Sequence, residues 1–149
     1  MNEAPLGLLF IILGALILMS GFFSSSETGM MSLNRYRLKH LKKEHRGARR
    51  ASKLLDQPET LISMILIGNN LVNIFASAIA TVIGLRLMGD SGIAIATLLL
   101  TFVILIFAEI IPKTFAAYHP ERVAFTFSHV LMPLRKLLFP VIWRINHLT

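Results

Sequence analysis

The stretch from Leu6 to Phe23, LGLLFIILGALILMSGFF, carries no charged side chain and decides the fold class. If its helix continues to residue 33, it is long enough to cross about 30 Å of hydrocarbon at about 1.5 Å per residue. The stretch lacks the positively charged start and the cleavage site of a signal peptide, so we expect it to remain in the mature protein. It is therefore predicted to be a first membrane span over residues 6–33.

A second uncharged stretch runs from Leu61 to Leu85 and predicts a span over residues 59–86. Pro58 stands just ahead of it, where the first turn of a helix tolerates proline, and Asp56 is a candidate cap. Residues 89–92, Gly-Asp-Ser-Gly, have the composition of a short turn between neighbouring helices. The second span is therefore predicted to lead directly into a third.

The third predicted span covers residues 92–112 and carries one charge, at Glu109. Beyond it the apolar runs are short and are interrupted by prolines and cations, which is typical of an amphipathic helix lying in the membrane interface. We place this juxtamembrane helix at residues 115–147. Residues 34–55, between the first two spans, are predicted to form short cytoplasmic helices divided at Gly47.

These elements together predict an all-α membrane protein that forms a single transmembrane domain over residues 1–149. The composition agrees, since 54% of the residues are hydrophobic and the mean hydropathy is +0.66. The chain has no cysteine, which excludes a disulfide framework, thiolate metal sites and a cysteine nucleophile. No hydrolase or metalloprotease motif is present and the five histidines have no metal-ligand spacing, so we do not expect an enzyme.

The formal net charge is +7, and nine of the fifteen Lys and Arg residues lie between Arg35 and Lys53. With the N-terminus outside, 14 of the 15 cations fall on the inner side, all except Arg86. The positive-inside rule therefore places the C-terminus in the cytoplasm. We expect a multi-pass protein of the cell inner membrane.

The basic stretch after the first span is predicted to face lipid. Its first five cations are Arg35, Arg37, Lys39, Lys42 and Lys43. Cations that directly follow a membrane helix attract anionic lipid headgroups, so membrane lipids are the expected partners and nucleic acid is not.

Three polar clusters lie inside the predicted spans, one in each. They consist of Ser24, Ser25, Ser26 and Glu27 in the first span, Gly68, Asn69, Asn70 and Asn73 in the second, and Glu109, Pro112 and Lys113 in the third. Counted from the inner boundary of each helix, Ser24, Asn69 and Glu109 lie roughly 16, 12 and 6 Å deep. Hydroxyl, amide and carboxylate oxygens suit Mg²⁺ or Ca²⁺, so their convergence would form a cation site.

Each cluster also has a purely structural interpretation. Serines allow close helix packing or kinking, asparagines in spans form interhelical hydrogen bonds, and Glu109 can pair with Lys113 four residues later. Two stripes of small residues predict helix contacts. These stripes are Gly7, Gly14 and Gly21 in the first span and Ala76, Ala80 and Gly84 in the second.

The three clusters in this order resemble the transmembrane domain of the CorC and cyclin-M (CNNM) family of magnesium transporters. The resemblance rests on the segments FFSSSET (residues 22–28), IGNNLVN (67–73) and AEIIPK (108–113). It implies a homodimer and downstream cytoplasmic CBS domains, which are absent from this chain.

The resemblance also implies that the transported ion is Mg²⁺, exported in exchange for Na⁺. The implied ligands are Ser24, Ser25, Gly68, Asn69, Asn73 and Glu109, supported by Glu27, Asn70, Pro112 and Lys113. The alternative function is a membrane cation sensor or scaffold that does not transport.

Overall fold

The computed structural model of the chain describes residues 5–148, without the side chains of residues 142, 143 and 145–148. The described part is almost entirely helical and contains no strand, which confirms the all-α fold class. In chain order the elements are α1 (Leu6–Met31), α2 (Arg35–Leu41), α3 (Arg46–Leu55), α4 (Pro58–Met88), α5 (Ser91–Val103), the π-helical segment η1 (Ile104–Ile110), α6 (Ile111–Tyr118) and α7 (Pro120–Leu148).

Three helical stretches of the described chain are long and apolar enough to cross a membrane: Leu6–Met31, Pro58–Met88 and Ser91–Tyr118. The third joins α5, η1 and α6 and continues past Pro112, where the prediction ended it at residue 112. Proline is tolerated here because it occupies the first turn of α6, directly after the π-helical register.

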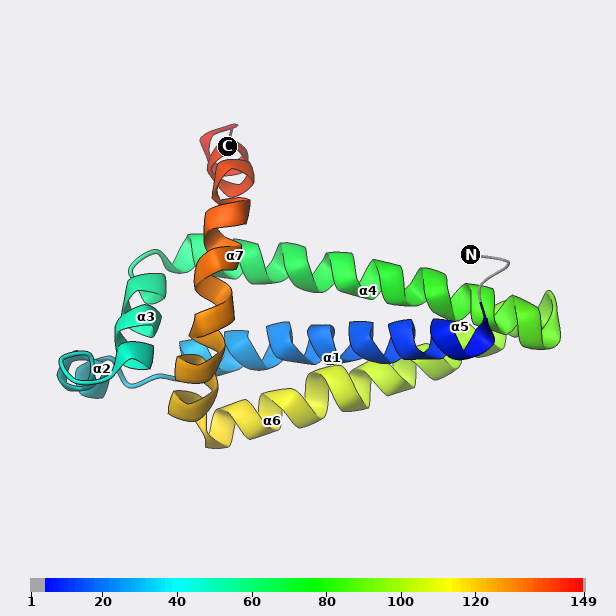
Figure 1. Cartoon of the computed structure of the whole chain (residues 1–149), viewed down its shortest axis with the longest axis horizontal. Helices are drawn as coiled ribbons and strands as arrows, with labels where there is room; N and C mark the ends of the chain where they lie inside the picture. Colours follow the sequence, from blue (N-terminus) through cyan, green and yellow to red (C-terminus); the bar gives the residue numbers. More distant parts are fainter. Residues whose placement is uncertain (1–4, 149) are drawn as a thin grey trace.

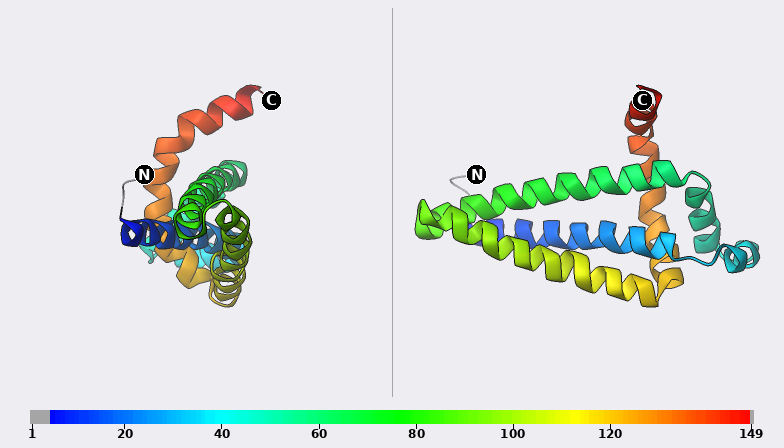
Figure 2. Two further views of the ribbon diagram at one scale, coloured as in Figure 1. Left: turned by 90° about the vertical axis from the view of Figure 1, so that its right-hand side faces the viewer. Right: turned by 180° about the vertical axis from the view of Figure 1, so that it is seen from behind.

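The three spans form an elongated bundle in which α1 lies between α4 and the η1–α6 part of the third span (Figures 1 and 2). Helices α4 and α5 form a tight hairpin, and Gly89 turns the chain with φ of 67°. Gly84 and Gly92 bring the two backbones together, since a Cβ on either residue would overlap the carbonyl of the other. This confirms the predicted turn.

The opposite end of the bundle carries α2, α3 and α7, and we call it the basic end (Figure 1). Here α7 runs across the ends of α1 and α4, while α2 lies farthest from the spans (Figures 1 and 2). Helices α1 and α7 pack closely at Gly29 of α1. A Cβ at this position would lie only 2.9 Å from a methyl of Val123, so the contact requires glycine. Arg50 of α3 adds hydrogen bonds to Ser128 Oγ at 3.1 Å and to the Phe125 carbonyl at 3.2 Å.

Two local predictions at this end are wrong. Gly47 does not divide the short helices; the break lies at residues 42–45, and Gly47 belongs to α3, where it lets the helix approach Phe125. The Asn34 side chain caps α2 and His45 Nδ1 caps α3 by accepting backbone N–H bonds. Asp56 does not cap α4, because it ends α3 instead.

The juxtamembrane helix α7 begins at Pro120, whereas the prediction began it at residue 115. Residues 111–118 still belong to the third span, and the chain changes direction at His119, whose φ and ψ are −130° and 59°. Pro133 and Pro140 lie inside α7 and remove two backbone donors, and Figure 2 shows the helix bending along its length.

One of the two predicted packing stripes is confirmed. Ala76, Ala80 and Gly84 are buried, whereas Gly7 and Gly14 are exposed and a Cβ on either would meet nothing within 4 Å. The first half of α1 packs through a different face, on which Leu9 contacts Ile79 and Ile83 of α4. The seven-residue glycine spacing therefore does not mark a contact face along this half of α1.

We predict that Gly92→Ala lowers the melting temperature of the purified protein in detergent. The new Cβ would overlap the Gly84 carbonyl, and overpacking of this kind costs about 1–3 kcal/mol. Gly14→Ala is the matched control, because its Cβ would meet nothing within 4 Å. Equal losses in the two variants, measured by thermal unfolding, would show that the hairpin does not depend on this contact.

Candidate functional site

Three side-chain oxygens converge between α1 and α4. The Ser20 hydroxyl lies 2.9 Å from Asn69 Oδ1 and 2.7 Å from Asn73 Oδ1. Ser20 is fully buried, and the two asparagines are partly buried on one face of α4, as their spacing of four predicts. These three residues are called the oxygen cluster below.

The oxygen cluster has more acceptors than donors. A serine hydroxyl carries one hydrogen, so it can donate to only one of the two amide oxygens at a time. The other oxygen then faces the Ser20 oxygen without a hydrogen between them. Turning one amide over would supply an NH₂ donor, and a bound cation would instead satisfy all three oxygens together.

Two further hydroxyls of α1 are buried without a hydrogen-bond partner in the described chain, those of Ser24 and Ser26. Ser24 follows Ser20 by four residues, so both lie on the same side of α1. The Ser25 hydroxyl is already used, because it donates to the Phe22 carbonyl at 3.1 Å. Leaving a buried polar atom unpaired costs about 1–3 kcal/mol. A polar occupant such as water or an ion beside Ser24 and Ser26 would therefore stabilise the folded protein.

On its other side α1 faces the π-helical segment. A Cβ on Gly21 would lie 3.5 Å from the Phe107 carbonyl oxygen and 3.2 Å from Pro112 Cγ. In this segment the N–H of each residue donates to the carbonyl five residues earlier, as Ile111 N–H does to the Ile106 carbonyl. The next carbonyl along the chain is that of Phe107, and the residue five positions later is Pro112. Because proline has no N–H, this carbonyl lacks its helical donor where it faces α1.

Glu109 lies in the same π-helical segment and pairs with Lys113, with 3.2 Å between Oε2 and Nζ. Its side chain is 30% exposed. Within residues 5–148, no hydrogen bond joins Glu109 to Ser24 or to the oxygen cluster. The ion pair that the sequence offered as the structural role of Glu109 is therefore present.

The remaining predicted site residues occupy different surroundings. Gly68 admits the ring of Phe23, whose Cζ would lie 2.5 Å from a Cβ at position 68. Asn70 is exposed and has no hydrogen bond to the oxygen cluster within the described residues, while Glu27 is half-buried. The structure thus joins Ser20 to Asn69 and Asn73 between α1 and α4, and it places Pro112 against Gly21 of α1. Ser24 is buried without a hydrogen-bond partner in the part of the chain that the structure describes, and Glu109 pairs with Lys113.

Sequence reasoning missed Ser20 and the Phe107 carbonyl. Ser20 could have been found, because it precedes Ser24 by one helical turn and so shares its face. A proline inside an apolar run was the available signal for a freed carbonyl, but the sequence does not specify where that carbonyl points.

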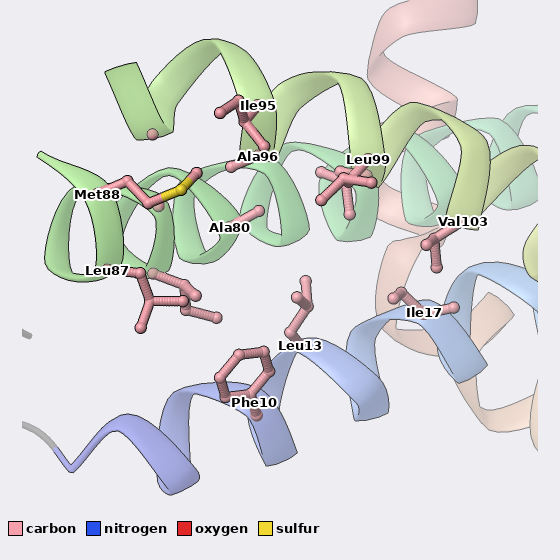
Figure 3. A pocket seen from close by; sticks show the side chains of 14 residues that line it. Phe10, Leu13, Ile17, Ala80, Leu87, Met88, Ile95, Ala96, Leu99 and Val103 are labelled. Carbon is pink, nitrogen blue, oxygen red and sulfur yellow. The ribbon is translucent and has the colours of Figure 1, made fainter. Parts of the chain in front are cut away.

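An apolar cavity of about 220 Å³ lies near the α4–α5 turn, between α1, α4 and α5 (Figure 3). Phe10, Ile17, Leu87 and Leu99 are among the residues that line it, and none of its lining side chains is charged. A hydrated cation would lose its water there without replacement, so this cavity is not part of the candidate cation site.

The described chain holds no group of three or more His, Asp or Glu side chains that could bind a metal. A cation at this site would therefore depend on hydroxyl, amide and carbonyl oxygens and on Glu109. Fold and site together define a multi-pass helical membrane protein with a buried, oxygen-rich centre between its spans.

The chain belongs to the family described as the cyclin M transmembrane N-terminal domain, whose model matches residues 10–149. This confirms the resemblance inferred from the three motifs. The chain is 57% identical over 150 residues to a UPF0053 protein of Haemophilus influenzae, covering 100% of this chain and 36% of that protein. It is 58% identical over 131 residues to the UPF0053 inner membrane protein YfjD of Escherichia coli, covering 87% of this chain and 31% of the relative.

A more distant relative is a chloroplastic DUF21 domain-containing protein of Arabidopsis thaliana, 32% identical over 133 residues, with 88% of this chain and 20% of the relative covered. The chain spans about a third of the length of the two bacterial relatives.

We predict different effects on stability from two serine substitutions in cation-free buffer. Ser20→Ala removes the donor of the oxygen cluster and should destabilise the protein by about 1–3 kcal/mol. Ser26→Ala removes a buried hydroxyl that has no partner and should leave stability unchanged or raise it. Thermal unfolding in detergent measures both, and a larger loss for Ser26→Ala than for Ser20→Ala would contradict the hydrogen bonding described above.

Proposed function

We propose that this chain is the membrane domain of a magnesium transporter that exports Mg²⁺ in exchange for Na⁺. The observation that supports this most strongly is the set of buried oxygens without sufficient donors on α1 and α4. Family membership supports the same class, because the motifs resemble those of the CorC and cyclin-M magnesium transporters. The proposed ligands are Ser24, Asn69, Asn73 and Glu109, to which the structure adds Ser20 as a candidate.

The separations within the oxygen cluster are hydrogen-bond lengths, and they lie closer to the ligand spacing of Mg²⁺ than to that of Ca²⁺. Neighbouring ligands of an octahedral ion lie about 3.0 Å apart at the Mg–O distance of about 2.1 Å, and about 3.4 Å apart at about 2.4 Å for Ca²⁺. The observed separations from Ser20 to the two amide oxygens are 2.9 and 2.7 Å. The cluster therefore requires less expansion to hold the smaller ion.

In this proposal Lys113 and Mg²⁺ compete for Glu109. The ion pair neutralises Glu109 when the site is empty, and an arriving Mg²⁺ draws the carboxylate toward α1. Gly21 lies where α1 meets Pro112 and Phe107, and Gly68 lies against Phe23, so small shifts at these two glycines would open the site to either side in turn.

We further propose that the protein lies in the cell inner membrane as a homodimer, with its N-terminus outside and the basic end in the cytoplasm. The charge distribution supports this orientation, since 14 of the 15 Lys and Arg residues then lie inside. The E. coli relative is named an inner membrane protein, which supports the location.

A sensor or scaffold that binds a cation without transporting it is the second candidate. The Glu109–Lys113 ion pair favours it, because a carboxylate already paired needs no transported ion. In this alternative the oxygen cluster would hold a structural ion or only join α1 to α4.

Calorimetric titration of the purified protein with Mg²⁺ tests the site. Glu109→Ala is expected to abolish saturable Mg²⁺ binding, whereas Lys113→Gln should preserve or tighten it, because a competitor of the ion is removed. Glu59→Gln, in the first turn of α4, is the matched control and should bind as the unmodified protein does. Equal Mg²⁺ binding by the Glu109→Ala variant and the unmodified protein would show that Glu109 is not a ligand of the ion and only pairs with Lys113.

Flux measurements in liposomes distinguish transporter from scaffold. With Mg²⁺ inside and Na⁺ outside, the protein should release Mg²⁺ at a rate that falls when Na⁺ is replaced by choline. Ser24→Ala should slow release at least about tenfold, because it removes one of the proposed ligands of the ion. Saturable Mg²⁺ binding without release would instead support the scaffold.

A further inference from the structure

A second candidate binding site lies at the basic end, in a hollow of about 270 Å³ between α3 and α7. It is lined by Lys53 of α3 and by Met132, Arg135, Lys136 and Phe139 of α7, and we call it the α3–α7 groove. The four α7 residues follow at i, i+3, i+4 and i+7, so they form one face of that helix. Two cations lie in the middle of this face, with an apolar side chain before and after them.

The cations of the groove lack acidic partners among the residues that the structure describes. No acidic residue is among those that line it. Within the described chain, Lys53 and Lys136 form no hydrogen bond or ion pair. The Arg135 guanidinium donates to Gln57 Oε1, a neutral group that orients it and leaves its charge intact. Elsewhere, in contrast, Arg37 pairs with Glu121 and Lys113 with Glu109.

The groove lies at the level of a membrane interface. Helix α7 crosses α1 at Gly29, which is 23 residues after Leu6 and therefore about 35 Å along the helix. This distance slightly exceeds the hydrocarbon thickness of about 30 Å, so we expect α7 to lie among the headgroups. Helix α2 lies farther from the spans (Figures 1 and 2). It carries Arg35, Arg37 and Lys39, three of the five cations that the sequence predicted to face lipid.

We propose that the α3–α7 groove binds the phosphate group of an anionic phospholipid in the leaflet at the basic end. Lys53, Arg135 and Lys136 provide three positive charges for the headgroup, and Met132 and Phe139 provide apolar surface for the start of the acyl chains. A soluble phosphate would leave this apolar surface in water, which favours a lipid as the occupant. The proposal does not depend on cation transport.

Spin-labelled lipids test the site with the whole chain. The purified protein is placed in phosphatidylcholine vesicles that contain a trace of spin-labelled phosphatidylglycerol or spin-labelled phosphatidylcholine. The fraction of motionally restricted lipid, measured by electron paramagnetic resonance, gives the preference for the anionic headgroup. Lys53→Gln combined with Lys136→Gln should lower this preference roughly threefold or more.

Lys42→Gln combined with Lys43→Gln is the matched control, because it removes the same charge from the same end of the protein. This control should keep most of the preference, and Lys53→Arg combined with Lys136→Arg should keep all of it, which separates loss of charge from misfolding. An equal loss in the Lys42, Lys43 variant would overturn the site in favour of a diffuse positive field. No loss in either glutamine variant would also overturn it.

A further experiment distinguishes a lipid phosphate from a soluble one. Millimolar inorganic phosphate, with ionic strength matched by chloride, should leave the restricted fraction of phosphatidylglycerol unchanged. Displacement of the labelled lipid by inorganic phosphate would assign the groove to a soluble anion and overturn the lipid proposal.

Discussion

The position of α1 between two different neighbours is the constraint on which the rest of the structure depends. On one side Ser20 reaches Asn69 and Asn73, and on the other Gly21 lets Pro112 and the Phe107 carbonyl approach. In hydrocarbon, polar groups cannot form hydrogen bonds with water, so these contacts between helices hold the helices in one register. A Cβ at position 21 would lie 3.2 Å from Pro112 Cγ, so any larger side chain there would press against Pro112.

The same arrangement explains why the polar centre lies nearer the basic end than the α4–α5 turn. Toward the turn, α1 packs through Leu9 against Ile79 and Ile83, and the remaining space forms an apolar cavity. Toward the basic end, α6 and α7 pack against α1, and Ser20, Ser24, Ser25 and Ser26 of α1 are buried. Arg50 of α3 and Gly29 of α1 hold α7 at this end, through hydrogen bonds to Ser128 and Phe125 and through close packing against Val123.

Much of the fold could be predicted, because the relevant signals are local. Uncharged stretches of sufficient length specify spans, and Gly89 with its neighbours specifies the hairpin. The errors occur where tertiary contacts compete with local signals. Gly47 permits close packing against Phe125 and does not break a helix, and the third span continues through Pro112 because the π-helical register accommodates proline.

The sequence by itself determined the class of this protein, the order of its spans, the basic character of one end and the chemical nature of the candidate ligands, since each follows from composition and spacing along one helix. Only the tertiary structure decided which oxygens meet. It brought Ser20 to the asparagines, left Ser24 and Ser26 buried without partners, paired Glu109 with Lys113, and joined Lys53 to Arg135 and Lys136. The physical reason is that contacts between helices depend on their rotation and crossing, which small residues and buried area set together.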